Sequence, residues 1–349
     1  MFTVGDKTVG GGAKPFIIAE VSANHGGSVQ RAKETIFAAK RAGASAVKIQ
    51  TYTPDTMTLK SEKNDFVINE GLWQGYTLYQ LYQEAHTPFE WHEELFEFAK
   101  SQGVILFSTP FDETAVDLLV SLDTPAFKIA SFEITDLPLI EYAASKGKPL
   151  FISTGMSSEV EIGDALECCY RKGNTNILLF HCVSSYPADL RTSHIGDMSY
   201  IQACFNVDVG LSDHTTSNLA SLLAVAKGAS AIEKHFKLDT QDCGPDASFS
   251  ILPDQLKSLC ADCESAFEAI KCNQLKRESS ELKNKKFRRS LYFVKALAKN
   301  EVISKDHIRR VRPGFGLEPK YFDWVIGRKV NQNVDCGDAV TLDLLKNDD

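Results

Sequence analysis

Two histidines that end apolar runs could bind a metal ion. His214 ends the run "VGLSDH" (209–214), and His235 lies in "AIEKHF" (231–236). Neutral imidazole is the most common protein ligand of transition metals, and two imidazoles leave positions open for water or a substrate oxygen, as a catalytic Mn, Zn or Co site requires. Two hydrogen-bonded core histidines would give the same pattern, and His25 is a third candidate ligand.

Cationic and hydroxyl side chains stand at the ends of other apolar runs. The set comprises two lysines and four hydroxyl residues: Lys48, Lys128, Thr109, Ser131, Ser153 and Ser212. Ammonium groups supply charge and hydroxyls supply directed donors, so the set suits a ligand with a phosphate and a carboxylate. A lysine in this setting can also form a Schiff base with a carbonyl substrate, and spacing alone does not separate the two kinds of chemistry.

Eight short, β-rich runs carry these residues and alternate with segments of helical period. We expect strands at 15–23, 46–51, 104–110, 126–131, 149–155, 177–184, 208–213 and 231–236. Strands that are apolar on both faces and joined by helices form a parallel sheet that is covered all round. Eight such units within about 270 residues predict a (β/α)8 TIM barrel of the α/β class rather than an open doubly wound sheet.

The C-terminal mouth of such a barrel holds the active site, at the strand ends and in the loops that follow them. The expected strands end in a series of polar residues: Glu20, Asn24, His25, Lys48, Gln50, Ser108, Thr109, Lys128, Ser131, Glu133, Ser153, Thr154, His181, Ser184, Ser212, Asp213, His214, Lys234 and His235. Any one of them could be a structural residue, but burying so many charges without shared ligands would cost several kcal/mol each. The rim therefore predicts an enzyme site rather than a binding module on a scaffold.

Composition excludes several other classes of protein. The 349 residues carry a net charge of -8, whereas nucleic-acid and membrane-surface binders carry a basic excess. No run approaches the roughly 18 apolar residues that span a bilayer, so we expect a cytoplasmic protein. The nine cysteines fit reduced, buried thiols without a zinc pattern.

The chain divides into three expected regions. Residues 1–272 hold the barrel, the charged segment 273–289 reads as a linker, and residues 290–349 contain short strands and turns that predict a small β-rich domain.

Ordered motifs along nearly the whole chain resemble the sialic acid synthase family, whose members condense phosphoenolpyruvate with amino sugars to make nine-carbon keto sugars (nonulosonates). The motifs include "IIAEVSANHGG" (17–27), "FKIASFEITDLPLI" (127–140), "GLSDH" (210–214), "IEKHF" (232–236), "GPDASFSILP" (244–253) and "RPGFG" (312–316). Within the family, "KIQTYTPDTMTL" (48–59) and "GLWQGYTLYQLYQEAHTPFEWH" (71–92) are most similar to the pseudaminic acid branch. The resemblance implies a TIM barrel followed by an antifreeze-like (SAF) domain.

The resemblance also implies roles for individual residues. His214 and His235 would bind a divalent metal, manganese first, with Mg²⁺ or Co²⁺ as alternatives. Glu20, Lys48 and Lys128 would be catalytic, and phosphoenolpyruvate would contact the two lysines together with Thr109, Ser131, Ser153 and Ser212. The sugar would face Gln50, Glu133, Tyr186, Asp246 and Arg312, with Arg312 reaching across a domain-swapped homodimer from the SAF domain of the partner.

The reaction implied is the condensation of phosphoenolpyruvate and water with a 6-deoxy diacetamido hexose, 2,4-diacetamido-2,4,6-trideoxy-β-L-altropyranose, to give pseudaminic acid, a flagellin modification, and phosphate. Synthesis of N-acetylneuraminate or legionaminate is the alternative, although Ser184 replaces an amide usual in sialic acid synthases. A Schiff-base aldolase or lyase using Lys128 is the rival from another class. Phe132, Tyr186 and Phe249 would line part of the sugar pocket, or serve as plain packing.

Overall fold

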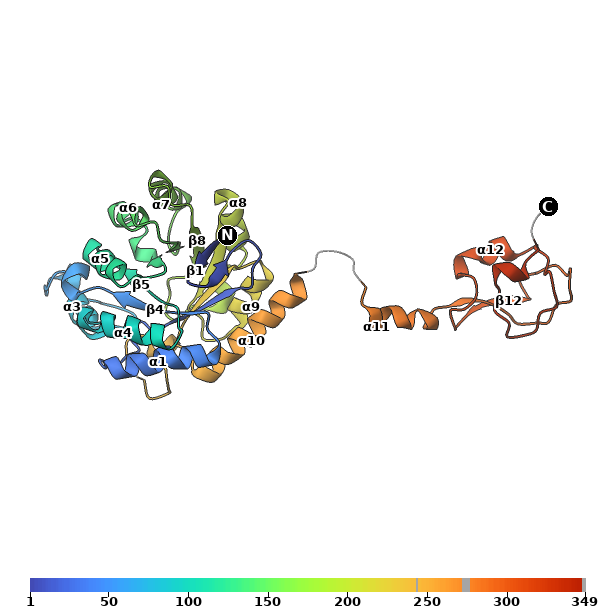
Figure 1. The fold of residues 1–349 in the computed structure, drawn as a ribbon, viewed down its shortest axis with the longest axis horizontal. Coiled ribbons are helices and arrows are strands. Elements are labelled where there is room, and N and C mark those ends of the chain that lie inside the picture. Colours follow the sequence, from blue (N-terminus) through green and yellow to red (C-terminus); the bar gives the residue numbers. More distant parts are fainter. Residues whose placement is uncertain (243, 272–276, 347–349) are drawn as a thin grey trace. The chain divides into compact units, whose positions relative to one another are not determined.

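The computed structural model describes residues 1–242, 244–271 and 277–346, and Figure 1 shows the fold. The chain forms two compact units, Met1–Lys271 and Cys272–Asp349. Of the expected linker 273–289, residues 273–276 lie outside the described part of the chain. Its described remainder contains helix α11 (Ser279–Leu282) and a 3-10 helix (Lys283–Phe287).

The first unit is a closed barrel of eight parallel strands, which confirms the predicted fold. The strands follow the order β10-β3-β4-β5-β6-β7-β8-β9, so the last strand pairs with the first. Their bounds are β3 (Phe16–Glu20), β4 (Ala46–Thr51), β5 (Leu106–Pro110), β6 (Phe127–Ile129), β7 (Leu150–Ser153), β8 (Ile177–Cys182), β9 (Asp208–Asp213) and β10 (Ala231–His235). All the mouth-facing ends of a parallel barrel lie on one side, which gathers the strand-end residues there.

A helix follows each barrel strand, and these helices cover the barrel from outside (Figure 1). These helices are α1 (Val29–Ala42), α4 (Phe89–Ser101), α5 (Glu113–Ser121), α6 (Leu137–Ser145), α7 (Glu159–Arg171), α8 (Asp197–Phe205), α9 (Leu219–Ala226) and α10 (Pro253–Ile270). Local sequence sets their ends: Ser28 caps α1 by accepting the Arg31 N–H, and Gly43 ends it with a left-handed φ of 102°. The longer β4–α4 connection adds α2 (Pro54–Met57) and α3 (Leu78–Ala85).

Alternating side chains along each strand build two cores. Residues such as Val47 point outward and pack under the helices. The inward residues nearest the N-terminal ends of the strands form a second apolar cluster, which includes Ile18, Phe107, Phe151 and Phe180. The polar residues therefore occupy the upper, C-terminal layer of the barrel interior.

A hairpin before the first barrel strand closes the other end of the barrel. It consists of β1 (Phe2–Val4) and β2 (Lys7–Val9), which pair antiparallel, and sequence analysis did not predict it. Phe2, Val4 and Val9 are buried in the inner apolar cluster. The hairpin therefore caps the apolar end and leaves only the polar end of the barrel open.

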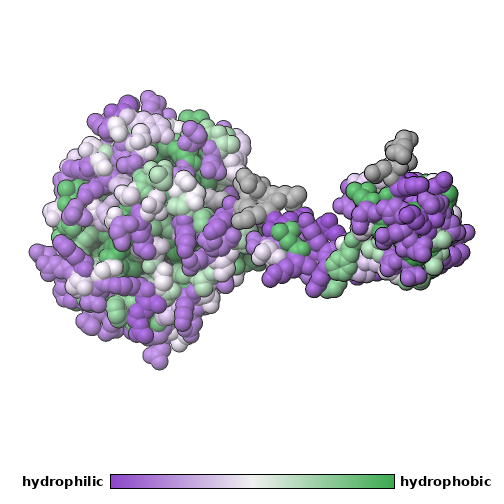
Figure 2. All heavy atoms as spheres, turned by 45° about the vertical axis from the view of Figure 1, so that its right-hand side comes forward, coloured by the Kyte–Doolittle hydropathy of each residue, from purple (hydrophilic) through white to green (hydrophobic). Residues whose placement is uncertain are grey.

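The second unit has a core of its own. Strands β11 (Ser290–Phe293) and β12 (Ile308–Val311) pair antiparallel, and helix α12 (Phe322–Val325) packs with them through a separate apolar cluster. On the faces seen in Figure 2, hydrophilic residues cover most of both units, and apolar residues form scattered patches. Among the described residues, no helix combines the length and apolar character needed to cross a membrane.

Candidate active site

A buried cluster of charges fills the polar end of the barrel. Lys48 Nζ lies 2.8 Å from Glu20 Oε2 and donates to Thr109 Oγ1 at 2.9 Å. All three residues are almost fully buried. These contacts join strands β3, β4 and β5 through predicted site residues.

Glu233, which sequence analysis did not single out, is the centre of this cluster. Its Oε1 accepts from Lys128 Nζ at 2.6 Å and from the Ser212 hydroxyl at 2.9 Å, and its Oε2 lies 3.5 Å from Lys48 Nζ. The signal that could have found it is the two-residue period of a strand: Glu233 must share the inward face of β10 with His235. One carboxylate therefore connects both predicted lysines.

Burial and charge act on the two carboxylates differently. Burial raises the pKa of Glu20 to about 7, although Lys48 opposes the shift. Burial also acts to raise the pKa of Glu233, but Lys128 and Lys48 outweigh it and hold that pKa well below its usual range. Near neutral pH the two lysines thus face fewer than two full negative charges, so the charge of an anion can be balanced here.

Small polar groups pack together at the C-terminal ends of β6, β7 and β8. Ser131 Oγ lies 2.9 Å from Cys182 Sγ and accepts the Gly155 N–H at 3.2 Å. A Cβ on Gly155 would come within 2.3 Å of Ser184 Oγ and 2.8 Å of Ser131 Oγ, so only glycine lets these hydroxyls approach the backbone here. Ser153, another predicted residue, is buried at the end of β7, two residues before Gly155.

The two predicted metal ligands lie side by side. The ring centroids of His214 and His235 are 5.5 Å apart. His214 Nδ1 lies 2.9 Å from the Val183 carbonyl oxygen, so Nδ1–H donates there and Nε2 keeps its lone pair. Burial lowers the pKa of both imidazoles, most strongly for His235, which keeps them neutral and able to bind a metal.

A metal with open coordination positions fits this pair. His235 Nδ1 is buried without a hydrogen-bond partner among the described residues, and it lies 3.8 Å from Asp246 Oδ2. No cluster of three or more His, Cys, Asp or Glu side chains suited to a metal occurs within the described ranges. The protein would therefore supply two imidazoles and leave the other positions to water or substrate.

His25 does not join the pair. Its Nε2 lies 3.3 Å from the Ala85 carbonyl oxygen, its Nδ1 accepts the Gly27 N–H at 3.2 Å, and its ring meets Trp91 edge-on. These contacts tie the His25 ring to the end of α3 and to α4 and occupy both ring nitrogens, so the structure does not place His25 as a third ligand.

Aromatic rings line the histidine pair on one side. The Tyr186 ring lies 4.5 Å from His214, and the Phe249 ring lies 4.8 Å from His235 and 5.1 Å from Tyr186. Phe132, the third ring predicted for the pocket, is 62% exposed instead.

The remaining predicted sugar contacts are distributed over both units. Gln50 is half-buried on β4. Glu133 Oε2 is buried without a hydrogen-bond partner, and burial raises the pKa of this carboxyl to about 7. Burial also raises the pKa of Asp246. Arg312 is exposed directly after β12 in the second unit.

Some strand-end polar residues face the helices instead of the mouth, which corrects their expected position. Lys234 Nζ donates to Asp213 Oδ2 at 2.8 Å and to the Thr215 carbonyl at 2.7 Å. Ser108 Oγ lies 2.6 Å from Thr51 Oγ1. Each neighbours an inward residue in sequence, so the strand period turns it outward.

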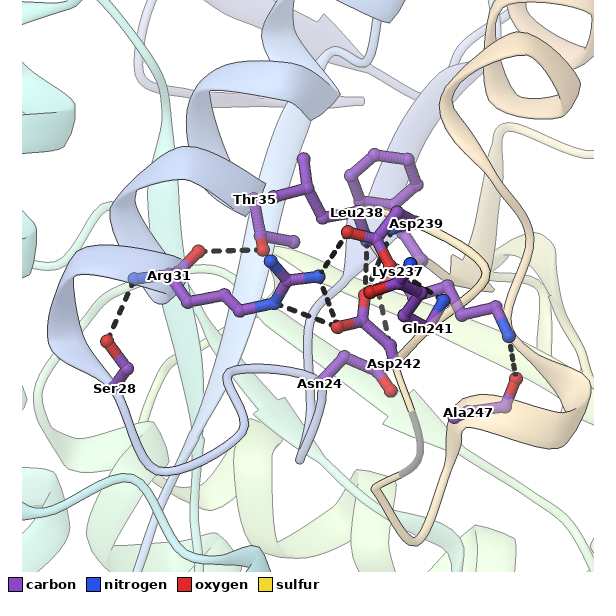
Figure 3. A network of polar contacts seen from close by, with 11 residues as sticks. Asn24, Ser28, Arg31, Thr35, Lys237, Leu238, Asp239, Gln241, Asp242 and Ala247 are labelled. Atoms are coloured by element: carbon purple, nitrogen blue, oxygen red, sulfur yellow. Dashed lines mark hydrogen bonds and ion pairs between the residues drawn. The ribbon is translucent and has the colours of Figure 1, made fainter.

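A clamp from α1 fixes the loop between β10 and α10, residues 236–252, described except for 243 (Figure 3). Arg31 Nε donates to Asp242 Oδ1 at 2.8 Å and Nη2 to Asp239 Oδ2 at 2.7 Å. Asp242 Oδ2 in turn accepts the backbone N–H groups of Leu238 and Asp239 at 3.0 and 3.1 Å. Asp242 thus ties the loop both to itself and to the helix.

Further contacts hold the half of this loop that carries Asp246 and Phe249. Asn24 Nδ2 donates to Ser250 Oγ at 2.8 Å. Lys237 Nζ donates to the Ala247 carbonyl at 2.7 Å (Figure 3). The position of both residues against His235 therefore depends on the whole network.

Replacing Asp242 should destabilise the barrel more than replacing Asp239. Asp242→Asn removes a charged acceptor whose side chain is 9% exposed, and we expect a cost of about 2 kcal/mol. The Asp239 side chain is 47% exposed, and Asp239→Asn should cost less than about 1 kcal/mol. Urea unfolding followed by circular dichroism measures both, and equal losses would contradict the role of Asp242.

Comparison with known proteins agrees with the fold. The NeuB family model matches residues 35–274, and the SAF domain model matches residues 288–346. The chain therefore belongs to the NeuB family.

Individual relatives show which synthases of this family the chain is similar to. The pseudaminic acid synthase of Campylobacter jejuni strain 81-176 is 42% identical over 327 residues, which cover 94% of this chain and 95% of that protein. The N,N'-diacetyllegionaminic acid synthase of Legionella pneumophila is 37% identical over 339 residues, 95% of each chain. The crystal structure of N-acetylneuraminic acid synthetase from Leptospira borgpetersenii has a TM-score of 0.73 at 30% identity, covering 81% of this chain and 94% of that one.

Proposed function

We propose that the chain is a pseudaminic acid synthase. It condenses phosphoenolpyruvate and water with 2,4-diacetamido-2,4,6-trideoxy-β-L-altropyranose to give pseudaminic acid and phosphate. The observation that carries the proposal is the buried Lys48, Lys128 and Glu233 cluster beside the His214–His235 pair, in a chain 42% identical to a pseudaminic acid synthase. Legionaminate and N-acetylneuraminate synthesis remain the alternatives, from relatives of lower identity.

Phosphoenolpyruvate binds at the lysines. The ammonium groups of Lys48 and Lys128 supply the charge for its phosphate and carboxylate, and directed donors come from the hydroxyls of Thr109, Ser131, Ser153 and Ser212. The excess of positive charge left by the half-protonated Glu20 supports this assignment. Burial strengthens each of these interactions because water does not screen them.

The histidine pair holds a divalent metal, Mn²⁺ first, with Mg²⁺ or Co²⁺ as alternatives. Such an ion supplies Lewis-acid polarisation of the sugar aldehyde. The unpartnered Nδ1 of His235 and the fixed tautomer of His214 support the assignment.

The chain's own residues then direct the bond changes. With phosphoenolpyruvate held by the lysines, its C3 attacks the aldehyde carbon, so the C–C bond forms as the enol double bond is used and the carbonyl π bond breaks, and the former aldehyde oxygen takes up a proton to become a hydroxyl. Water adds to the resulting cationic C2. The tetrahedral intermediate then collapses to the C2 ketone as the C–O bond to phosphate breaks, and the departing phosphate takes the remaining hydroxyl proton. Glu20 accepts the proton of that water, because a carboxyl with a pKa of about 7 is matched to a proton acceptor near neutral pH. Glu233 stays ionised and holds both lysines in place.

The second unit contributes to the site of a partner subunit in a domain-swapped homodimer. Arg312 is exposed and cationic, whereas Glu133 and Asp246 place acidic groups at the mouth. This complementarity supports Arg312 as a contact that completes the sugar site of the partner.

The test of the proposed function compares two sugars in a phosphate-release assay. With phosphoenolpyruvate and Mn²⁺, we expect kcat/KM for the diacetamido sugar to exceed that for N-acetylmannosamine by at least about 100-fold. Equal values, or a preference for N-acetylmannosamine, would contradict the proposed substrate.

The Schiff-base alternative has one observation in its favour, because burial lowers the pKa of Lys128. However, Lys128 Nζ holds an ion pair with Glu233 at 2.6 Å, which opposes that shift and occupies the amine. Borohydride with pyruvate should therefore trap no adduct on Lys128, and a trapped adduct would support the lyase.

A further inference from the structure

A tryptophan far from the barrel strands in sequence reaches the mouth. Trp73 lies in the β4–α4 connection, in an excursion closed by the bridge between Val67 and Thr77. Its indole Nε1–H donates to the Pro245 carbonyl at 3.2 Å, and its ring centroid lies 6.0 Å from that of Tyr186. Both partners belong to loops at the C-terminal ends of strands, so Trp73 reaches the mouth from outside the barrel.

Apart from Trp73, this excursion (residues 67–77) is held by hydrogen bonds between its own backbone groups, and several of its side chains are exposed. The Ile68 N–H donates to the Tyr76 carbonyl and the Gly75 N–H to the Ile68 carbonyl, each at 2.9 Å. Leu72 is 50% exposed, and Tyr76 is 39% exposed. Trp73 is half-buried between them, so its ring is the part of this excursion that packs against the site.

Trp73 extends the row of rings that begins at the histidine pair. Tyr186 packs on His214 and on Phe249, and Phe249 packs on His235, at the distances given above. Trp73 follows Tyr186 as the outer member of this row. A sugar whose aldehyde carbon lies at the histidines would direct its distal carbons along these ring faces.

Ring faces select among acceptor sugars by polarity. Acetamido methyl groups and a C6 methyl group pack favourably on aromatic faces. Hydroxyls at the same carbons would lose their water there without gaining a hydrogen-bond partner. We propose that Trp73 is a specificity-determining residue that packs on an apolar substituent of the acceptor and favours 6-deoxy diacetamido hexoses over more hydroxylated ones. This inference rests on the proposed function and identifies a residue that selects its sugar substrate.

The first test separates sugar selectivity from general damage. Trp73→Ala should lower kcat/KM for the diacetamido sugar by about 10- to 100-fold. The KM for phosphoenolpyruvate and kcat/KM for N-acetylmannosamine should stay within twofold, so that selectivity falls. Trp73→Phe keeps a ring and should retain most of the selectivity, and Leu72→Ala, at the exposed neighbour, should behave as the wild type.

A second readout follows binding without turnover. The chain has three tryptophans, and Trp91 and Trp324 lie on α4 and in the second unit. Adding the diacetamido sugar to the full-length protein should change the tryptophan emission, and Trp73→Phe should remove most of that change.

The outcomes distinguish the role of Trp73 from the proposed synthase function on which it rests. An active wild type whose Trp73→Ala variant keeps its selectivity would overturn the role of Trp73 and leave the proposed function standing. Equal losses for both sugars and phosphoenolpyruvate would also overturn it, because they would mark a structural defect. A wild type that releases no phosphate with either sugar would overturn the proposed function, and the role of Trp73 with it.

Discussion

Replacing His214 or His235 with alanine is expected to abolish phosphate release while the barrel stays folded. Each change removes one of two imidazoles proposed to hold the metal, and loss of even an outer partner of a metal ligand costs about 10- to 100-fold in affinity or activity. We therefore expect kcat to fall by more than about 100-fold. Folding should persist because the apolar cores lie below and around the mouth, and neither histidine belongs to them.

Metal analysis and chelation test the same prediction without relying on turnover of the variants alone. The wild type should lose activity in EDTA and regain it with Mn²⁺, and each alanine variant should bind less metal per chain. His86→Ala is the control, because His86 bonds to the Gln83 carbonyl at the end of α3 and should not affect metal binding. Full turnover by a chelated wild type would exclude the metal site.

Replacing Glu233 with glutamine is expected to damage both activity and stability. The change leaves Lys128 without its buried counter-ion and removes the group that positions Lys48. Breaking a buried ion pair from one side costs about 3–5 kcal/mol, and we expect the free energy of unfolding to fall by about 3 kcal/mol. Turnover should fall by at least about 100-fold, because the lysines no longer hold their positions.

Glu20→Gln is the matched comparison. It should cost similar activity, because it removes the proposed proton acceptor. Its effect on stability should stay within about 1 kcal/mol, because burial already holds the pKa of Glu20 near 7 and the neutral form is half-populated. Phosphate release and urea unfolding of both variants check the pair, and a Glu233→Gln variant as stable as the wild type would refute the central role of this carboxylate.

The barrel was predictable because its signal is repeated and local. Each strand segment was apolar on both faces and ended in a polar residue. Eight such strand–helix units in a row are compatible with few folds other than a TIM barrel. The inward face of each strand was less well defined. The interpretation of Lys234 as a mouth residue was wrong, and Glu233 was missed, because position at a strand end does not fix which neighbour faces inward; only the period counted back from His235 does.

Other features depend on contacts that no local pattern records. Trp73 and Pro245 are 172 residues apart, so nothing in the sequence around Trp73 indicates its hydrogen bond at the mouth. The hairpin that plugs the barrel is short, and its three buried residues gain their role only from the interior that they fill. The predicted ligand sets, the metal and the role of Arg312 stay predictions for the experiments above.

The pairing of β10 with β3 has a consequence for synthesis of the protein on the ribosome. Glu20 lies on β3, the first barrel strand to be synthesised, whereas Glu233 and His235 lie on β10, the last. In the strand register, His235 pairs opposite Glu20. A nascent chain without β10 contains Lys48 and Lys128 but lacks Glu233, which bridges them. It also lacks His235 and so has only one histidine of the proposed metal site. Activity therefore requires closure of the barrel by β10, and a chain that stops before this strand lacks both Glu233 and one histidine of the proposed metal site.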